Sequence, residues 1–443
     1  MKRLFNSAFW LFALLCFRPT DVSAQLDVDS ADASGEYYDA NYLRYINFTY
    51  KPEVKSVVLH KSQWPLSPPI IELNSGEQLE LHFDILDSAL ANLMYTVIHC
   101  DYDWKPSQLD KQEYMTGQFE DFINQYDYSR NTYQKYIHYS LSIPNDVIQL
   151  TRSGNYLLKV YVSGDEDDLI LTRRFCVTEN ILNVKATVHQ PTQVSKRYTH
   201  QEVDFSFTSD DYEITNPYHD LKVVILQNHS WENAITGLKP RFVMNSEFNY
   251  DYDGENTFEG LNEFRIIDLK NTRFTGQGVQ KMVVENRENH AYLVLDKSRA
   301  SMVYLQRPDI NGWFLIKNDW LNTQADIDAD YVHTHFRLGM NQPIKNADVY
   351  VFGALTDWQL KPEAKMTYSN ADLAYSCDLY LKQGLYNYLY AVAFDGTDEP
   401  DLSVIEGSHF QTENEYSILI YHRQLGWDYD RLLSYTTVRY GAD

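Results

Sequence analysis

The chain of 443 residues has a formal net charge of -24, and 44% of its residues are hydrophobic. This length predicts about three domains, and the apolar content is sufficient for several cores. The acidic excess excludes non-specific binding to nucleic acids and to anionic membrane surfaces, because both are themselves negatively charged.

The first 24 residues have the features of a secretory signal peptide. Lys2 and Arg3 precede an apolar run from Ala8 to Phe17, and a small-residue cleavage site follows at Val22-Ser23-Ala24. The apolar run has about ten residues, too few to cross a hydrocarbon layer of roughly 30 Å. We expect residues 1–24 to be removed, and residues 25–36, which are small and acidic, to form a flexible leader.

Residues 37–178 predict a first β-sandwich module. Short runs rich in β-branched and aromatic residues recur here between turn residues. In the run 79–85, Leu79, Leu81, Phe83 and Ile85 alternate with other residues, as in a strand with one face in a core. The segment 110–131 lacks this periodicity, and we interpret it as a surface excursion. The expected strands are 54–59, 79–85, 93–100, 137–143, 154–162 and 169–177.

Residues 181–325 predict a second β-sandwich module that ends in a packed linker. Beyond residue 302 the pattern is looser, and the turn Asp309-Ile310-Asn311-Gly312 precedes Trp313 and Trp320. We interpret this part as the linker. The expected strands are 184–189, 203–208, 221–227, 263–269, 279–285 and 291–295.

Residues 326–443 predict a third module, whose clearest part is the run 348–394. Tyr350 and Phe352 alternate with Val349 and Val351, and the later runs are joined at glycines, which is typical of an antiparallel meander. A strand at 416–422 is expected to close the module, followed by a short helical or coiled tail at 429–433. The sequence therefore predicts an all-β protein of tandem immunoglobulin- or fibronectin-like antiparallel sandwiches.

The cysteines do not form a disulfide framework. After signal cleavage only Cys100, Cys176 and Cys377 remain, an odd number with wide spacing. Cys100 and Cys176 could meet in space. The alternation places Cys176 on the polar side of its strand, however, so a bond between them is disfavoured.

One histidine pair has part of the pattern of a metal site. His333 and His335 share a face of a predicted strand just after Asp326, Asp328 and Asp330, and two imidazoles with a carboxylate can hold a metal ion. A further ligand at a fixed spacing is missing, so we expect a solvated strand start and no metal. The acidic run 251–255 lacks the terminal glutamate of a calcium loop and predicts a turn.

The sequence marks out no catalytic centre. It contains neither a nucleophile elbow nor a carboxylate pair that any predicted cleft would single out. We therefore expect no enzyme activity, no cofactor and no small-molecule substrate, and a role in binding or scaffolding.

Two glycine- and aromatic-rich stretches of the third module carry a first resemblance. Phe352-Gly353 leads to Trp358, and the run 384–388 leads to Phe394-Asp395-Gly396. In this the module resembles early-set immunoglobulin-like domains that bind glycogen or starch. The resemblance implies an alternative function, a secreted carbohydrate-binding protein with Trp358 as a sugar platform. A packing role for Trp358 is open beside it.

Short segments spread over nearly the whole chain after the leader carry a second resemblance. They are Pro69-Ile70-Ile71-Glu72-Leu73, the run from Tyr95 to Trp104, Ser153-Gly154-Asn155-Tyr156, Arg173-Arg174-Phe175, Gln227-Asn228-His229-Ser230-Trp231, Asn262-Glu263-Phe264-Arg265, Asp309-Ile310-Asn311-Gly312, Leu381-Lys382-Gln383-Gly384 and Glu406-Gly407-Ser408-His409. Together these segments resemble the plug protein of the type IX secretion system, a Bacteroidetes family.

This resemblance implies a non-catalytic periplasmic protein. It would bind the giant translocon barrel protein of the outer membrane and close its pore when no cargo is engaged, without entering the membrane itself. Aromatic loops supply the candidate contact residues Tyr102, Trp104, Trp313 and Trp320, because buried Trp and Tyr often anchor interfaces. The alternative that these aromatics pack inside their own modules is open.

Overall fold

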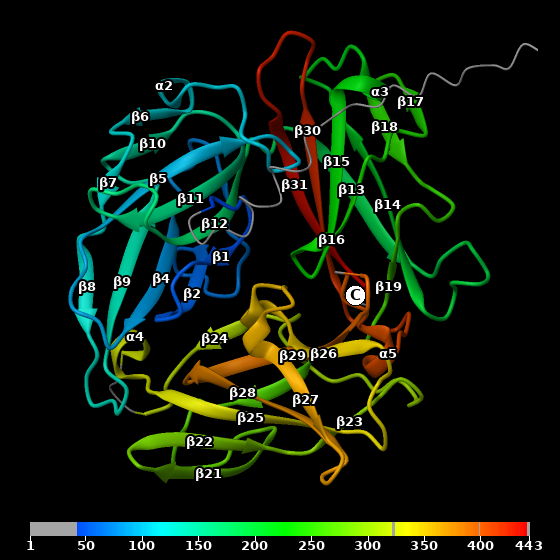
Figure 1. The fold of residues 1–443 in the computed structure, drawn as a ribbon. Coiled ribbons are helices and arrows are strands. Elements are labelled where there is room, and N and C mark those ends of the chain that lie inside the picture. The colour runs from blue at the N-terminus through cyan, green and yellow to red at the C-terminus, as the bar shows by residue number, and fades with distance from the viewer. Residues whose placement is uncertain (1–41, 321–323, 398, 441–443) are drawn as a thin grey trace, which may run out of the picture. The chain divides into compact units, whose positions relative to one another are not determined.

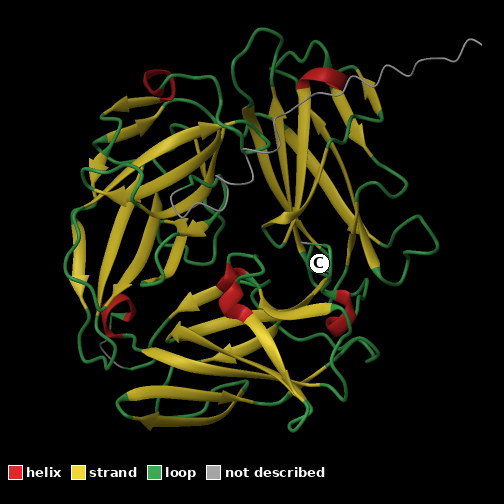
Figure 2. Ribbon diagram, in the orientation of Figure 1, coloured by secondary structure: helices red, strands yellow, loops and turns green. Residues whose placement is uncertain are grey.

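The structure, a computed structural model, describes residues 42–320, 324–397 and 399–440. The predicted signal peptide (1–24) and leader (25–36) lie outside the described residues. Strands dominate the described chain, and its helices are single turns (Figure 2), so the predicted all-β class is confirmed. None of the helices in these ranges is long and apolar enough to cross a membrane. The residues from Leu43 onward belong to one compact unit.

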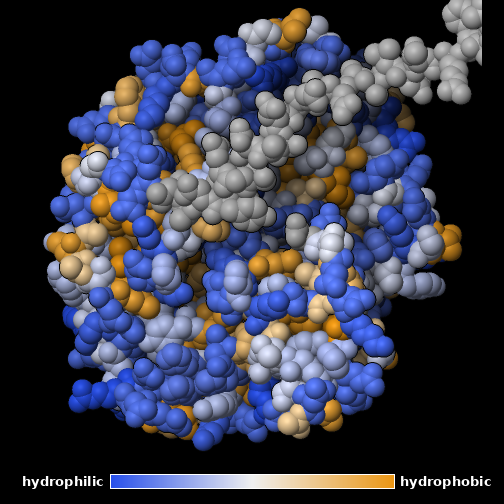
Figure 3. Space-filling model, in the orientation of Figure 1, coloured by the Kyte–Doolittle hydropathy of each residue, from blue (hydrophilic) through white to orange (hydrophobic). Residues whose placement is uncertain are grey.

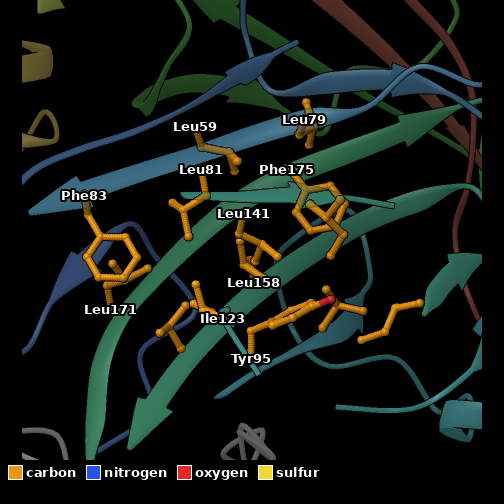
Figure 4. Packing of buried hydrophobic residues seen from close by; sticks show 14 of the residues in the cluster. Leu59, Leu79, Leu81, Phe83, Tyr95, Ile123, Leu141, Leu158, Leu171 and Phe175 are labelled. Carbon is orange, nitrogen blue, oxygen red and sulfur yellow. The ribbon is translucent and has the colours of Figure 1, made fainter. Parts of the chain in front are cut away.

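Sandwich 1 consists of two sheets packed face to face, as predicted from the alternation of β4. Leu79, Leu81 and Phe83 of β4 are fully buried against Tyr95 and Phe175 of the opposite sheet (Figure 4). The first sheet has the order β1 (Phe48–Thr49), β12 (Leu169–Thr178), β11 (Gly154–Val162), β5 (Leu93–Cys100) and β7 (Asp121–Phe122), with β3 (Ile70–Glu72) parallel to β12. The second sheet has the order β2 (Val54–Lys61), β4 (Leu79–Leu86), β9 (Tyr136–Ile143) and β8 (Gln125–Tyr128). Sandwich 1 also contains a separate two-stranded sheet of β6 (Met115–Gly117) and β10 (Ile148–Leu150), and the helical turn α2 (Lys111–Tyr114).

Sandwich 2 is built from two distant parts of the chain. β30, the last strand but one, pairs with the whole length of β15, from Leu221 opposite His422 to Gln227 opposite Tyr416. Figure 1 shows these C-terminal strands, in red, beside the green strands of the sandwich. One sheet has the order β13 (Asn183–His189), β14 (His200–Thr208), β18 (Glu247–Tyr250) and β17 (Phe242–Met244), with β19 (Thr257–Glu259) on β14. The other has the order β16 (Ser230–Thr236), β15 (Leu221–Gln227), β30 (Glu415–His422) and β31 (Arg431–Arg439), and α3 (Pro217–Asp220) precedes β15.

Sandwich 3 is one ten-stranded sheet that folds back over its own core. Val349 and Val351 of β26 and Tyr388 of β29 pack in this core with Phe336 of β25. Its order is β20 (Arg265–Asp268), β29 (Gly384–Phe394), β26 (Ala347–Phe352), β27 (Lys365–Ser369), β28 (Ala374–Lys382), β25 (Tyr331–Gly339), β22 (Glu288–Leu293) and β21 (Val279–Glu285), with β23 (Asp296–Lys297) on β25 and β24 (Phe314–Ile316) on β29. Its short helical turns are α4 (Ala325–Asp328), η1 (Ala354–Thr356), η2 (Pro362–Ala364) and α5 (Ser403–Glu406).

The strand pairing groups the chain differently from the predicted modules. Strands β20 to β23, expected in the module 181–325, pair within sandwich 3, whereas β30, expected in the module 326–443, pairs within sandwich 2. The prediction of a helical or coiled tail at 429–433 is wrong, because these residues lead into β31. Alternation reveals a strand but not its partner, so the pattern could not show these crossings. The boundaries 37–178, 181–325 and 326–443 as separate domains stay a prediction.

The first sheet of sandwich 1 is buried on both of its faces. Cys100 and Cys176 are free, buried thiols, so the predicted polar side of the strand around Cys176 is wrong. Burial raises the pKa of the Cys100 thiol to about 12 and also raises the pKa of the Cys176 thiol. The reason is that sandwich 2 covers the face of β12 that would otherwise meet water.

Candidate functional site at the junctions of the three sandwiches

An apolar junction joins sandwich 1 to sandwich 2. The first sheet of sandwich 1 and the β15–β30 sheet of sandwich 2 face each other with their outer sides. A buried hydrogen bond crosses this junction, from the Tyr421 hydroxyl to Oδ1 of Asn155 at 2.7 Å. Arg423 adds an ion pair to Asp101 at 2.9 Å. The buried residues of the junction are Ile70, Cys100, Trp104, Leu157, Cys176, Val224, Leu226, Leu419, Tyr421 and Leu432.

Four tryptophans line a small cavity where all three sandwiches contribute residues. Trp104 comes from sandwich 1, Trp231 from β16 of sandwich 2, and Trp313 and Trp358 from sandwich 3. Trp104 meets Trp231 edge to face at 4.8 Å, and the guanidinium of Arg174 lies 4.4 Å from the Trp104 ring. Burial lowers the pKa of Arg174 to about 10. The cavity holds about 110 Å³, far below the roughly 300–1,000 Å³ of a typical small-molecule site.

The segment Asp309-Ile310-Asn311-Gly312 fixes the sandwich 3 side of this cavity. Gly312 has a φ of +82°, and a Cβ there would lie 2.4 Å from Trp358 and 2.8 Å from Phe264. Only glycine fits between these rings. Burial raises the pKa of Asp309 to about 7, against the hydrogen bonds that its carboxyl group accepts from the backbone of Asn311 and Phe264.

A buried ion pair joins sandwich 1 to sandwich 3. Nζ of Lys382 lies 2.6 Å from Oδ2 of Asp84, and both side chains are almost completely excluded from water. The Tyr331 hydroxyl donates to the same oxygen at 2.7 Å, and His138 pairs with the other oxygen at 2.7 Å. Burial alone would raise the pKa of Asp84, but Lys382 and His138 outweigh it and hold this pKa below its ordinary value.

Two further groups of charged residues are a buried cluster within sandwich 3 and an ion pair of sandwich 2 that lies beside Trp313 of sandwich 3. Within sandwich 3, Glu406 is fully buried between Arg265 and Arg299, at 3.0 and 2.6 Å. Burial alone would raise the pKa of Glu406, but the two guanidinium groups lower it. Toward sandwich 2, His229 pairs with Glu415 at 2.7 Å and its ring lies 5.4 Å from Trp313.

Three of the four sequence-predicted contact residues lie at these junctions. Trp104 is 6% exposed, and Tyr102 lies over the same junction, its ring 6.3 Å from Tyr421. Trp313 is half-buried in the tryptophan-lined cavity. Trp320 is half-buried away from it, under the guanidinium of Arg273 at 4.2 Å. Contact of these four residues with a partner stays a prediction. Three of the four line contacts between sandwiches, which neither of the sequence-based alternatives had foreseen.

The predicted histidine pair gains a neighbour that the sequence did not reveal. His290 of β22 stacks on His333 at 4.9 Å and on His335 at 5.4 Å. The upstream carboxylates lie elsewhere: Asp328 pairs with Arg130, and Asp330 accepts hydrogen bonds from the backbone of residues 133 and 134. The parallel pairing of β22 with β25 is what brings His290 there, and no local pattern signals it.

Sequence reasoning missed a set of exposed aromatics on one rim of sandwich 1. β7 and β8 are end strands of the two sheets and follow each other along the chain, on one side of the sandwich (Figure 1). We call the set the aromatic rim: Phe119, Phe122, Tyr126, Tyr128 and Tyr133, which are 40% to 59% exposed. The face of the molecule in Figure 3 is largely hydrophilic, with hydrophobic residues in separate patches. The excess of aromatics without alternation in segment 110–131 was the available signal.

Several of the segments that carry the family resemblance build the junctions. Trp104, Asn155, Arg174 and Trp231 meet between sandwiches 1 and 2, and Lys382 supplies the ammonium between sandwiches 1 and 3. The glycine turn at 309–312, another of these segments, packs against Trp358 beside the cavity between the sandwiches. The shared residues therefore hold sandwiches against each other rather than line a large cleft.

Comparisons with known proteins agree with the resemblance to the plug family. Residues 54–179, nearly all of sandwich 1, match the family model described as type 9 secretion system plug protein 1st domain. A crystal structure of a hypothetical protein from Parabacteroides merdae is similar over 90% of this chain and 100% of its own, with 33% sequence identity and a TM-score of 0.86. No protein of curated function matches significantly. The chain belongs to the plug protein family of the type IX secretion system.

Proposed function

We propose that this protein is a non-catalytic periplasmic plug. It binds the periplasmic side of the type IX translocon barrel in the outer membrane and closes the pore when no cargo is engaged. The observation that supports the proposal is the set of junctions, because several of the segments that resemble the plug family hold the three sandwiches against each other.

A plug has to resist deformation, and the junctions supply that property. Domains within a chain move relative to one another unless their interface is large and apolar. Here the junction of sandwiches 1 and 2 has a continuous buried cluster, and sandwich 3 is tied to sandwich 1 by an ion pair with both charges buried. The pair favours one packing of the two sandwiches, because a shifted packing would leave one charge buried without its partner.

The size of the body suits a wide opening. A compact unit that begins at Leu43 has about 400 residues, which gives a radius of gyration of roughly 21 Å. A folded body of this size covers a pore mouth tens of ångströms wide, which a flexible chain would leave permeable. The acidic character of the chain favours solubility over adhesion to anionic lipid.

The surface that we propose for the barrel contact is the aromatic rim. Tyr, Phe and Trp are enriched at interface anchors, and here five aromatics are exposed on or near two end strands. The rim also lies within residues 54–179, the part matched by the family model. Release then follows from competition: cargo in the barrel favours a barrel conformation that binds the rim less well.

Co-purification tests the binding step. The protein is isolated from membranes of a host that expresses the translocon, and we expect a very large outer-membrane barrel protein to accompany it and to be lost when cargo carriers occupy the barrel. In the variant with Phe122→Ser and Tyr128→Ser the yield of barrel is expected to fall at least tenfold. The matched control is Phe242→Ser with Met244→Ser on the end strand β17 of sandwich 2, where both residues are similarly exposed.

Permeability tests the closing step. Deletion of the gene is expected to admit small hydrophilic dyes and antibiotics through empty translocons, and the wild-type gene is expected to restore the barrier. An outer membrane that stays equally tight after deletion, with export channels empty, contradicts the plug function. Loss of barrel from the β17 control but not from the rim variant contradicts only the assigned surface.

The alternative carbohydrate-binding function gains no support from Trp358. The ring packs edge to face against Phe264 at 6.0 Å and against Phe352 at 5.8 Å. It also lines the small cavity between the sandwiches rather than an open platform. This is the packing role that the sequence had left open.

A further inference from the structure

Three histidines lie in a row on the second sheet of sandwich 1, on the face opposite to its core. His60 of β2, His82 of β4 and His138 of β9 come from neighbouring strands. The His82 ring stacks on His60 with centroids 5.6 Å apart and on His138 with centroids 5.3 Å apart. The plug function proposed above makes no use of this row.

Two of these histidines present nitrogens at the spacing of metal ligands. Nδ1 of His82 lies 3.1 Å from Nε2 of His138. Two nitrogens that each lie about 2.0–2.1 Å from a tetrahedral zinc ion are roughly 3.3 Å apart. A carboxylate oxygen of Asp326, in α4, completes a set of three ligand atoms that all lie within 4.8 Å of one another. The donors therefore come from sandwich 1 and from the segment that leads into β25.

The other nitrogen of His138 is hydrogen-bonded to a carboxylate, since Nδ1 of His138 lies 2.7 Å from Oδ1 of Asp84. A carboxylate in this position fixes the tautomer of a metal-bound histidine and leaves its other nitrogen to the ion. Nε2 of His82 lies 3.8 Å from Oε2 of Glu80, which is beyond hydrogen-bond distance. Burial lowers the pKa of His82, which favours the neutral ring that a metal requires.

The buried ion pair positions both sides of this set. Lys382 Nζ lies 2.6 Å from Asp84, the partner of His138, and also donates to the backbone oxygen of Asp326 at 2.7 Å. One ammonium group thus fixes the carboxylate that orients His138 and the backbone of the residue that supplies the third donor. The contact uses the backbone of Asp326, so its exposed carboxylate is free to bind an ion without breaking the pair.

Two clusters elsewhere in the described chain lack one of these features, and in the group of His60, Glu80 and His82, which shares His82 with this set, Glu80 already accepts a hydrogen bond from Ser62. His290 and His335 also approach to 3.1 Å, but their surroundings do not form such a set of three ligand atoms among the described residues. In the group of His189, Glu202 and Asp204, the carboxylate of Glu202 already accepts hydrogen bonds from Thr192. The cluster of His290 and His335 serves as a control.

We propose that His82, His138 and Asp326 bind a divalent transition metal ion, with Zn²⁺ as the preferred ion, and that the ion clamps α4 onto sandwich 1. Two imidazoles, one carboxylate and a water molecule form a tetrahedral set that zinc accepts. The ion adds a direct bond between the second sheet of sandwich 1 and the segment preceding β25, next to the buried Asp84–Lys382 pair.

The test is a titration of the full-length chain with Zn²⁺ alone. The protein is purified through a tag that contains no histidine, freed of metal with a chelator, and followed by calorimetry and thermal unfolding. We expect about one ion per chain and a higher Tm with Zn²⁺. Asp326→Ala and His82→Ala are each expected to weaken binding at least tenfold, whereas His335→Ala leaves it unchanged.

Asp326→Ala keeps the test clear of misfolding, because it removes an exposed side chain and keeps the backbone contact to Lys382. Its Tm without zinc should equal that of the wild type. The proposal is overturned if the wild type binds no zinc at stoichiometric concentration, if binding survives both variants, or if His335→Ala abolishes it. In a zinc-soaked crystal, an anomalous peak between His82 and His138 supports the site, and a peak only elsewhere refutes it.

Discussion

Replacement of Lys382 by methionine isolates the ion pair between sandwiches 1 and 3. Methionine keeps much of the length of the side chain and removes the ammonium that Asp84 and the backbone of Asp326 share. Asp84 is then left as a buried carboxylate with only His138 and Tyr331 as partners. Removing one member of a buried pair typically costs about 3–5 kcal/mol.

The protonation of Asp84 sets an upper limit on this loss at pH 7. An unfolded aspartate has a pKa near 3.9, so protonating the carboxyl group at pH 7 costs about 4 kcal/mol. We therefore expect Lys382→Met to lower the free energy of unfolding by about 3–4 kcal/mol at pH 7. At pH 5 the corresponding limit is roughly 1.5 kcal/mol, so the loss should shrink.

The wild type should not show this pH dependence from the same group. The pKa of Asp84 is lowered in the folded state, so its stabilisation is fully present above the unfolded pKa near 3.9 and is lost as the pH falls through the folded value. Between pH 5 and pH 7 the contribution of Asp84 is constant in the wild type, whereas in Lys382→Met the penalty grows with pH.

Urea unfolding at pH 5 and pH 7, followed by tryptophan fluorescence, measures both effects. The matched control is Lys365→Met, because Lys365 pairs with Asp348 at 2.7 Å with both side chains about half exposed, and such pairs contribute about 0–1 kcal/mol. The double variant Asp84→Asn with Lys382→Met should lose less than the sum of the single variants. A loss in Lys382→Met no larger than that of the control, or one equal at both pH values, would refute the reasoning.

Three further predictions follow from the junctions and the charges near them. Glu406→Gln leaves Arg265 and Arg299 without their buried partner and should lower stability by about 3–5 kcal/mol in urea unfolding; a loss below about 1 kcal/mol contradicts it. The pKa of Asp309 is raised to about 7, so the folded state holds a proton that the unfolded state releases, and stability should fall by up to about 4 kcal/mol as the pH rises from 4 to 7. Asp309→Asn should flatten this part of the profile, and an unchanged slope counts against the assignment. Trp104→Ala should cost about 3–5 kcal/mol, and Trp104→Phe clearly less, in thermal or urea unfolding.

Local pattern was sufficient for most strands. The predicted strands 93–100, 154–162, 221–227 and 279–285 have the bounds of β5, β11, β15 and β21. In most of these runs side chains alternate between a core and the other face, or are largely apolar, and either pattern is visible within seven to nine residues. The prediction for the tail at 429–433 was wrong because these few residues show no clear alternation of apolar and polar side chains. The strand β31, which begins at Arg431, is recognised only by its pairing with β30.

Pattern could not assign strands to sheets or tryptophans to interfaces. β15 pairs with β30 across almost two hundred positions, and a strand carries no signal for a partner that far away. Trp104 and Trp231 are separate aromatic residues in the sequence, and they meet only because two sheets pack with their outer faces together. The same is true of Cys176, whose polar-looking side is covered by another sandwich.

The sequence by itself determined the all-β class, most of the strands, the acidic character and, through short shared segments, the plug family. The tertiary structure decided how the chain is divided among sandwiches, that Asp84 and Lys382 form a buried pair, and that His82, His138 and Asp326 lie together. The physical reason is the distance along the sequence over which each kind of interaction acts. Alternation and turn chemistry act over a few residues, whereas ion pairs, cavities and ligand sets join residues that only packing brings within a few ångströms.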